Sequence, residues 1–142
     1  MPIIDVDLGG YVEPQVVTEL DKVYTLKIRT HEEKEGVGQK SSDPYHTLDL
    51  LCAITDSELE NPKMVRKTLF LPVNGDDFDR RNAKIGQIRR LQKAIGDVDP
   101  SGEPNQSLDP DAWANCEFKA KLGLKHDEQY GDSNTVKRIV VQ

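Results

Sequence analysis

Lysines alternate with aliphatic residues near the end of the chain, a pattern suited to following a chain of phosphates. The cations on one side of this extended segment are Lys119, Lys121 and Lys125, and Lys137 and Arg138 follow after a turn. Ammonium and guanidinium groups bind phosphates, and a polymer of phosphates needs cations spaced along a surface. The pattern therefore indicates a local basic stripe that binds a polyanion.

Basic residues recur on two earlier segments that also alternate. Lys27 and Arg29 alternate with apolar residues over 23–30, and Arg66 and Lys67 lie in a later segment. Solvated lysines on a strand also discourage edge-to-edge pairing with another sheet. For each set of basic residues alone, this is the alternative explanation without a binding function. Because cations repeat on three strands, we favour a surface that follows the backbone of a single-stranded nucleic acid.

Aromatic side chains decide whether such a stripe binds bases as well as phosphates, since each stacked base contributes about 1–3 kcal/mol. Phe70 is the best candidate because it shares a strand face with Arg66. Tyr45, at the start of a strand, and Tyr130, in a hairpin turn, follow. The other large aromatics are expected to pack in the interior: Tyr24, Phe78, Phe118 and the loop residue Trp113.

The overall charge limits the extent of this surface. The chain has 142 residues and a net charge of -6, with 31% charged and 6% aromatic residues. This balance excludes a protein that coats nucleic acid by bulk positive charge, so any basic site must be local. The length favours one domain, 1–142, with an aliphatic core.

The residue pattern predicts no enzyme, no metal site and no cofactor. Asp76, Asp77 and Asp79 lie at an expected helix start, where carboxylates cap the helix and oppose its dipole. The histidines lack the spacing of metal ligands, and no Gly-Lys-Ser/Thr follows the glycines near residue 37. A magnesium-dependent nuclease that uses these three aspartates is the last-ranked alternative.

Cysteine usage and hydropathy indicate a cytoplasmic protein. Cys52 and Cys116 each fall in an apolar alternation, which favours reduced thiols in the interior over a disulfide framework. No apolar run approaches the roughly 20 residues of a membrane span, and the N-terminus lacks the features of a signal peptide.

Alternation and turn residues predict five strands and one helix. The strands are expected over 23–30, 45–56, 64–73, 116–125 and 135–141, and the helix from Asp76 or Asp77 to Gly96. Residues 1–21, 31–44 and 97–115 are expected to be irregular. Leu122 and Leu124 are expected on the inward face of the fourth strand, whose exposed edge would permit a homodimer.

This order of elements predicts an all-β fold with one helix. Three strands, one helix and two further strands are the order of an OB-fold, a five-stranded Greek-key barrel that binds oligonucleotides or oligosaccharides. Closure of a barrel would also explain the alternation, because each strand then has one face inward and one toward water.

The second half of the chain resembles a family of phage-encoded single-stranded DNA-binding proteins. The matching residues are Ala94, Ile95 and Gly96 at the helix end, Tyr130 and Gly131 in the turn, and Asn134, Val136, Lys137 and Arg138 in the last strand. The resemblance covers roughly residues 14–142. It implies an OB-fold that protects single-stranded DNA during replication or recombination in the host cytoplasm, without enzymatic activity or cofactor.

Three features keep another class of function open. Many single-stranded DNA-binding proteins end in an acidic tail that recruits replication or recombination proteins, whereas this sequence ends on Val141 and Gln142. The net acidity and the few aromatic residues also fit an OB-fold protein-interaction module, such as a virion or recombinase adaptor, whose basic face meets an acidic partner.

Overall fold

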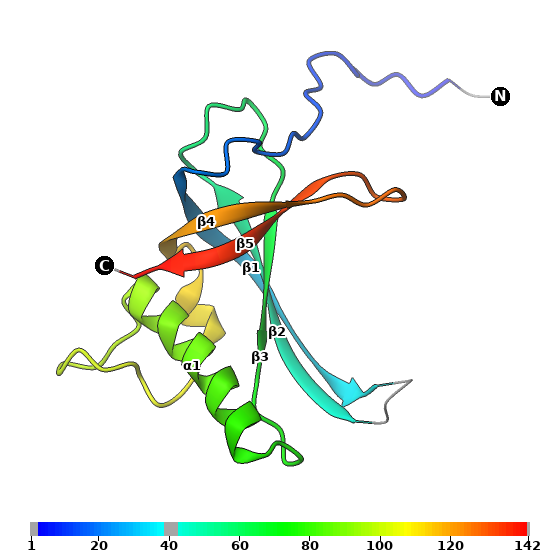
Figure 1. The fold of residues 1–142 in the computed structure, drawn as a ribbon. Coiled ribbons are helices and arrows are strands. Elements are labelled where there is room, and N and C mark those ends of the chain that lie inside the picture. The colour runs from blue at the N-terminus through cyan, green and yellow to red at the C-terminus, as the bar shows by residue number, and fades with distance from the viewer. Residues whose placement is uncertain (1–2, 39–42, 142) are drawn as a thin grey trace.

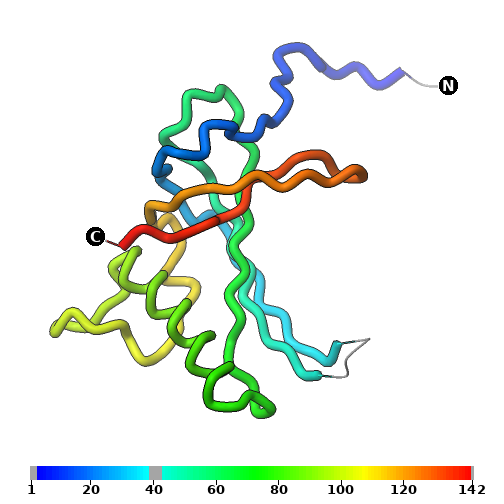
Figure 2. Tube along the Cα trace, viewed as in Figure 1, coloured from blue at the N-terminus to red at the C-terminus, as the bar shows by residue number. Residues whose placement is uncertain are grey.

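The computed structural model describes residues 3–38 and 43–141 and contains five strands and one α-helix in this part of the chain (Figures 1 and 2). The strands are β1 Val23–Val37, β2 Pro44–Ile54, β3 Val65–Phe70, β4 Glu117–Lys125 and β5 Ser133–Val140. The helix α1 spans Phe78–Ile95, and a short 3-10 helix spans Pro110–Trp113. The predicted all-β class with one α-helix between the third and fourth strands is confirmed.

The strands pair in the order β1-β2-β3-β5-β4, and β4 pairs in turn with β1. All pairs are antiparallel except β3 with β5, which is parallel and has one register pair, Arg66 with Thr135. The sheet is therefore mixed. Because β4 lies between β1 and β5, the predicted exposed edge near residues 116–125 is wrong.

The predicted loop over residues 31–44 is also wrong for residues 31–37, because β1 continues to Val37 and pairs with β2 as far as Pro44. Residues 39–42 of the predicted loop lie outside the described residues. A cross-strand ion pair stabilises this polar extension, with Lys34 Nζ 3.6 Å from Asp49, and His46 Nε2 lies 3.2 Å from a Glu33 oxygen. Both faces of the extension carry polar residues, so it lacks the apolar alternation by which a strand is recognised. In Figure 1 this β1–β2 hairpin projects away from the rest of the sheet.

The core forms where the inward faces of the strands meet the second half of α1. Its aliphatic centre includes Leu26, Ile28, Leu48, Leu50, Val65, Leu69, Leu91 and Leu122, each at most 1% exposed. Tyr24 and Phe118 are buried as predicted. Two other predicted core residues are exposed: Phe78 (78%) begins α1 ahead of the buried turns, and Leu124 (45%) lies near the end of β4.

The ends of α1 follow the predicted caps. The Asp77 side chain accepts a 2.8 Å hydrogen bond from the Arg80 backbone N–H, and Gly96 ends the helix with φ of 82°. Asp76 accepts hydrogen bonds from Val73 N and from Lys84 Nζ, and these bonds hold its pKa below the usual range. Asp76 and Asp77 at this helix start therefore have structural partners.

Asp97 organises the connection after α1. Its carboxylate accepts from Trp113 Nε1 at 3.0 Å and from Gln92 Nε2 at 3.1 Å, and it also binds the Asn105 side chain. Burial acts to raise the pKa of Asp97, but these hydrogen bonds outweigh it and lower the pKa. Trp113 is 1% exposed, so its predicted packing role is confirmed.

The N-terminal segment is attached to the sheet through Asn134, which is 3% exposed. Its side chain accepts from Val17 N at 2.7 Å and donates to Val17 O at 2.9 Å and to Gly123 O at 3.1 Å. One amide thus satisfies three backbone groups from distant parts of the chain.

Replacing Asn134 with alanine is expected to lower the free energy of unfolding by about 1–3 kcal/mol, because buried backbone groups of Val17 and Gly123 lose their partner. Chemical denaturation monitored by circular dichroism measures this change. The matched control is Ser133→Ala on the same strand, which should stay within about 0.5 kcal/mol of the unmodified protein. Equal stabilities of the two variants would contradict the assigned role.

No helix in the described residues is both long and apolar enough to cross a membrane.

Candidate nucleic-acid interface

The outer side of β3 carries Arg66, Thr68 and Phe70, while Val65 and Leu69 point into the core. Phe70 is 54% exposed although it lies in a strand of the central sheet. Arg66 is exposed and lies opposite Leu51 on β2 and Thr135 on β5. β3 therefore presents a guanidinium and an aromatic ring on one side, as predicted.

Tyr45 adds a second exposed ring on the same side. Thr47 is the register partner of Phe70, and Tyr45 lies two residues before Thr47 on β2, so the two rings occupy diagonal positions. Diagonal neighbours have Cα atoms roughly 7–8 Å apart, which long and aromatic side chains span. The Tyr45 ring also lies over Gly36, where an added Cβ would stand 2.9 Å from the phenol oxygen.

Cations gather where β5 meets β4. Lys121 lies directly opposite Arg138, and the register changes by one residue immediately beyond this pair. The extra residue is Lys137 on β5, and such a bulge turns Lys137 and Arg138 to the same outer side. Both of these side chains are exposed.

The register joins this cluster to Arg66, since Thr135 of β5 pairs with Arg66 on one side and with Gly123 of β4 on the other. We call Arg66, Lys121, Lys137 and Arg138 the basic track. Like charges that face each other across strands destabilise a sheet. None of these cations forms an ion pair with a carboxylate of the described residues. An unbalanced cluster of this kind is suited to an external anion.

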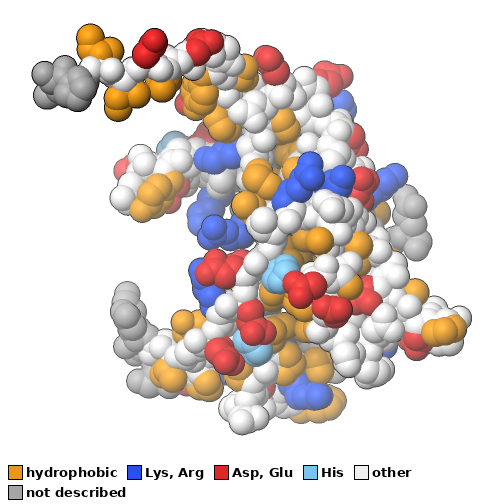
Figure 3. Space-filling model, turned by 180° about the vertical axis from the view of Figure 1, so that it is seen from behind, with side chains coloured by type: hydrophobic (Ala, Val, Ile, Leu, Met, Phe, Trp, Pro, Cys, Tyr) orange, Lys and Arg blue, Asp and Glu red, His pale blue; other side chains and the backbone are white. Residues whose placement is uncertain are grey.

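Figure 3 shows the hollowed face beside this cluster. Lys and Arg side chains gather in the hollow between the tip of the β4–β5 hairpin and the β1–β2 hairpin. Lys125 and Tyr130 belong to the β4–β5 hairpin, and Tyr130 is 75% exposed in its turn. Asp127 holds this turn by accepting from the backbone N–H groups of Gln129 and Tyr130, and these bonds lower its pKa.

The structure places other predicted residues away from the basic track. Lys119 lies two residues along β4 from Lys121 and pairs with Thr25. Lys27 lies opposite Glu117 of β4 in the strand register. Arg29 is exposed at the register change between β1 and β2. Only Lys119 of these residues extends the track directly.

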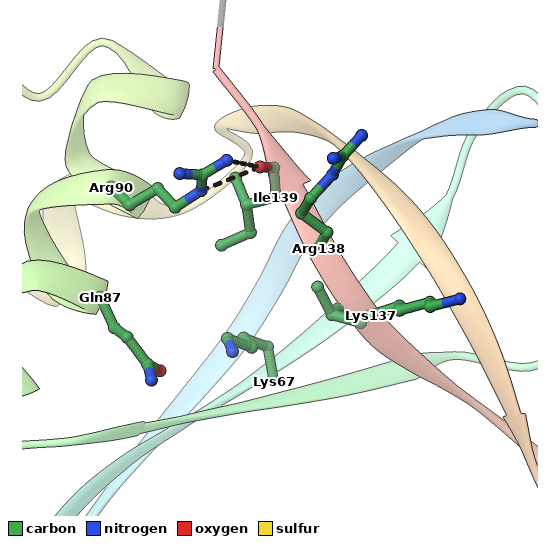
Figure 4. A pocket seen from close by; sticks show the side chains of 7 residues that line it. Lys67, Gln87, Arg90, Lys137, Arg138 and Ile139 are labelled. Carbon is green, nitrogen blue, oxygen red and sulfur yellow. Dashed lines mark hydrogen bonds between the residues drawn. The ribbon is translucent and has the colours of Figure 1, made fainter. Parts of the chain in front are cut away.

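Lys67 does not share the outer side with Arg66, contrary to the prediction. Strand alternation puts it on the side of Val65 and Leu69, where it lines a pocket of about 240 Å³ with Gln87 and Arg90 of α1 and with Lys137 and Arg138 of β5 (Figure 4). Burial lowers the pKa of Lys67. The alternation that predicts Leu69 as a core residue also predicts the inward position of Lys67.

Arg90 and Gln87 of α1 were not predicted as part of a site. Arg90 donates two hydrogen bonds to Ile139 O, of 3.0 and 2.8 Å, which attach α1 to β5 (Figure 4). No pattern in the sequence indicates this contact, because Arg90 is one of several cations on α1.

Two observations on the described residues concern covalent and metal chemistry. Burial raises the pKa of Cys52 to about 12, so this thiol is not a nucleophile at neutral pH. Within the ranges 3–38 and 43–141, no three His, Cys, Asp or Glu side chains form a group that could hold a metal ion.

Comparisons with known proteins assign no family. No protein-family model matches the chain, and no curated protein matches it. The family resemblance of the C-terminal segment therefore stays a prediction, and a proposal of function depends on the geometry of the described residues.

Proposed function

We propose that this protein binds single-stranded DNA, with little sequence preference and without catalysis, on the outer side of β3, β5 and β4. The observation that carries this proposal is the basic track, in which cations adjacent across three strands lack carboxylate partners among the described residues. Phosphates would supply the missing negative charge.

The aromatic residues favour a single strand over a duplex. Phe70 and Tyr45 are exposed on the side of the sheet that also carries Arg66. Unpaired bases can stack on such rings, whereas the bases of a duplex are already stacked and paired. Stacking accepts every base, so little sequence preference is expected.

We further propose that the fold is an OB-fold, a five-stranded Greek-key barrel. The pairing order β1-β2-β3-β5-β4 with return to β1, and the helix between β3 and β4, support this assignment. The face of strands 2 and 3 is the usual ligand surface of that fold, and it carries Tyr45, Arg66 and Phe70 here. A phage protein that protects single strands during replication or recombination in the host cytoplasm fits these properties.

The cations of the basic track should differ from cations elsewhere on the sheet. Lys121→Ala and Arg138→Ala should each weaken oligo-dT binding and reduce the slope of log K against log salt by roughly 0.7 per lost phosphate contact. The matched control is Lys27→Ala, because Lys27 lies on β1 opposite Glu117. Fluorescence anisotropy across a salt series measures both quantities.

The proposal fails if Lys121→Ala and Arg138→Ala leave affinity and slope unchanged. Binding of an acidic protein that survives nuclease treatment, together with no oligonucleotide binding, would instead support the protein-interaction module.

A further inference from the structure

The N-terminal arm, residues 3–8, has the composition of a strand without a partner. Ile4, Val6 and Leu8 alternate with Asp5 and Asp7, so an extended arm has one apolar side and one acidic side. Ile4 and Leu8 are each 81% exposed. In Figure 1 the arm projects away from the sheet and from α1. Exposed apolar residues in such an array usually mark an interaction segment.

The body of the protein holds only the base of this arm. Asn61 Nδ2 donates to Val12 O at 2.8 Å, and Gln15 N donates to Asn61 O at 2.9 Å. Within residues 3–8 the one hydrogen bond to a side chain is from Gly9 N to the Asp7 carboxylate at 2.9 Å. The arm therefore starts from a fixed point and is free to contact another molecule.

β3 presents an open edge that matches a short strand. Leu71 N donates to His46 O of β2 at 2.7 Å, so the backbone groups of alternate residues point toward β2. The N–H and C=O groups of Thr68 and Phe70 then point to the other side. In the described residues β5 pairs with β3 on that side at Arg66 alone. Unpaired strand edges of this kind accept an added strand.

Two pockets that β3 and α1 line together lie along this edge, and we call them the basic groove. One is the pocket of about 240 Å³ that contains Lys67 and Arg90. The other is a pocket of about 360 Å³ lined by Phe70, by Arg80 and by Lys84, which is paired with Asp76. Gln87 lines both pockets, so they are neighbours along the helix.

We infer that the N-terminal arm of one copy adds as a strand to the open β3 edge of a second copy. Alternation on β3 puts Lys67 on one side of the edge and Phe70 on the other. Alternation in the arm puts Asp5 and Asp7 on one side and Val6 with its apolar neighbours on the other. An added strand therefore aligns its acidic side with Lys67 and its apolar side with Phe70.

This association does not depend on nucleic-acid binding. It has one consequence for the proposed function, because Phe70 also belongs to the surface offered to bases. A docked arm and a single strand then compete for Phe70, and oligo-dT is expected to release the arm.

Sedimentation velocity of the full chain without nucleic acid tests the inference. The sedimentation coefficient should rise with protein concentration at low salt. The arm variant Asp5→Lys/Asp7→Lys and the groove variant Arg80→Glu/Gln87→Glu should each remain monomeric. An equimolar mixture of the two should associate again, because the charges are complementary once more. Both variants change exposed residues and leave the core intact.

The matched control is Arg81→Glu/Lys93→Glu, which changes exposed cations of α1 that do not line the groove. This variant should associate like the unmodified protein. A protein that stays monomeric at every concentration would overturn the inference, and so would association that both charge-reversed variants retain or a mixture that fails to restore it.

Discussion

Trp113→Ala is expected to lower the free energy of unfolding by about 3–5 kcal/mol, the largest effect of any single change considered for this chain. Trp113 is 1% exposed and fills the space between the connection after α1 and the strands. Its removal leaves a cavity and also takes a hydrogen bond from Asp97, whose carboxylate holds Gln92 and Asn105. A loss of this size is a large part of the stability of an ordinary domain.

Denaturation in guanidinium, monitored by circular dichroism, measures the effect. Tyr130→Ala is the matched control, because Tyr130 is 75% exposed in a hairpin turn and its removal should change stability by no more than about 0.5 kcal/mol. If Trp113→Ala is as stable as this control, the connection after α1 is not anchored to the core through Trp113.

Phe70→Ala is expected to weaken oligo-dT binding by about 1–3 kcal/mol, which is roughly 5- to 150-fold in Kd. Stacking releases no counterions, so the slope of log K against log salt should stay nearly constant. Because Phe70 is already 54% exposed, the fold should tolerate the change well. Anisotropy titrations give affinity and slope from the same samples.

Phe78→Ala provides a control of the same residue type. Phe78 is 78% exposed at the start of α1, outside the strands of the sheet, and its replacement should leave the affinity unchanged. An unaltered affinity in Phe70→Ala, or an equal loss in Phe78→Ala, would remove Phe70 from the proposed interface.

Much of the fold could be predicted because apolar alternation marks strands with one buried face. Leu26 and Leu50 followed this rule, and Asp77 and Gly96 marked the ends of α1 by their capping chemistry. The extension of β1 through Glu33 did not follow the rule, since residues 29–37 of β1 are all exposed. Its pairing depends on β2, and cross-strand pairing is not visible in a local pattern.

The candidate site could be predicted only in part. Arg66 and Phe70 belong to one strand, so alternation alone placed them on the same side. Their connection to Arg138 depends on the parallel pairing of β3 with β5 and on the bulge at Lys137, which are long-range features. Lys67 is different, because the alternation that predicts Leu69 in the core also predicts Lys67 on the inward side of β3.

The most direct test of the central claim compares a labelled oligo-dT with a duplex of equal length by fluorescence anisotropy over a series of salt concentrations. The basic track, with Lys119 and Lys125 beside it on β4, provides cations for about four to six phosphates, so log K for the single strand should fall against log salt with a slope of roughly -3 to -4. The single strand should bind more tightly than the duplex at every salt concentration. Binding that does not respond to salt, or a preference for the duplex, would contradict the proposal.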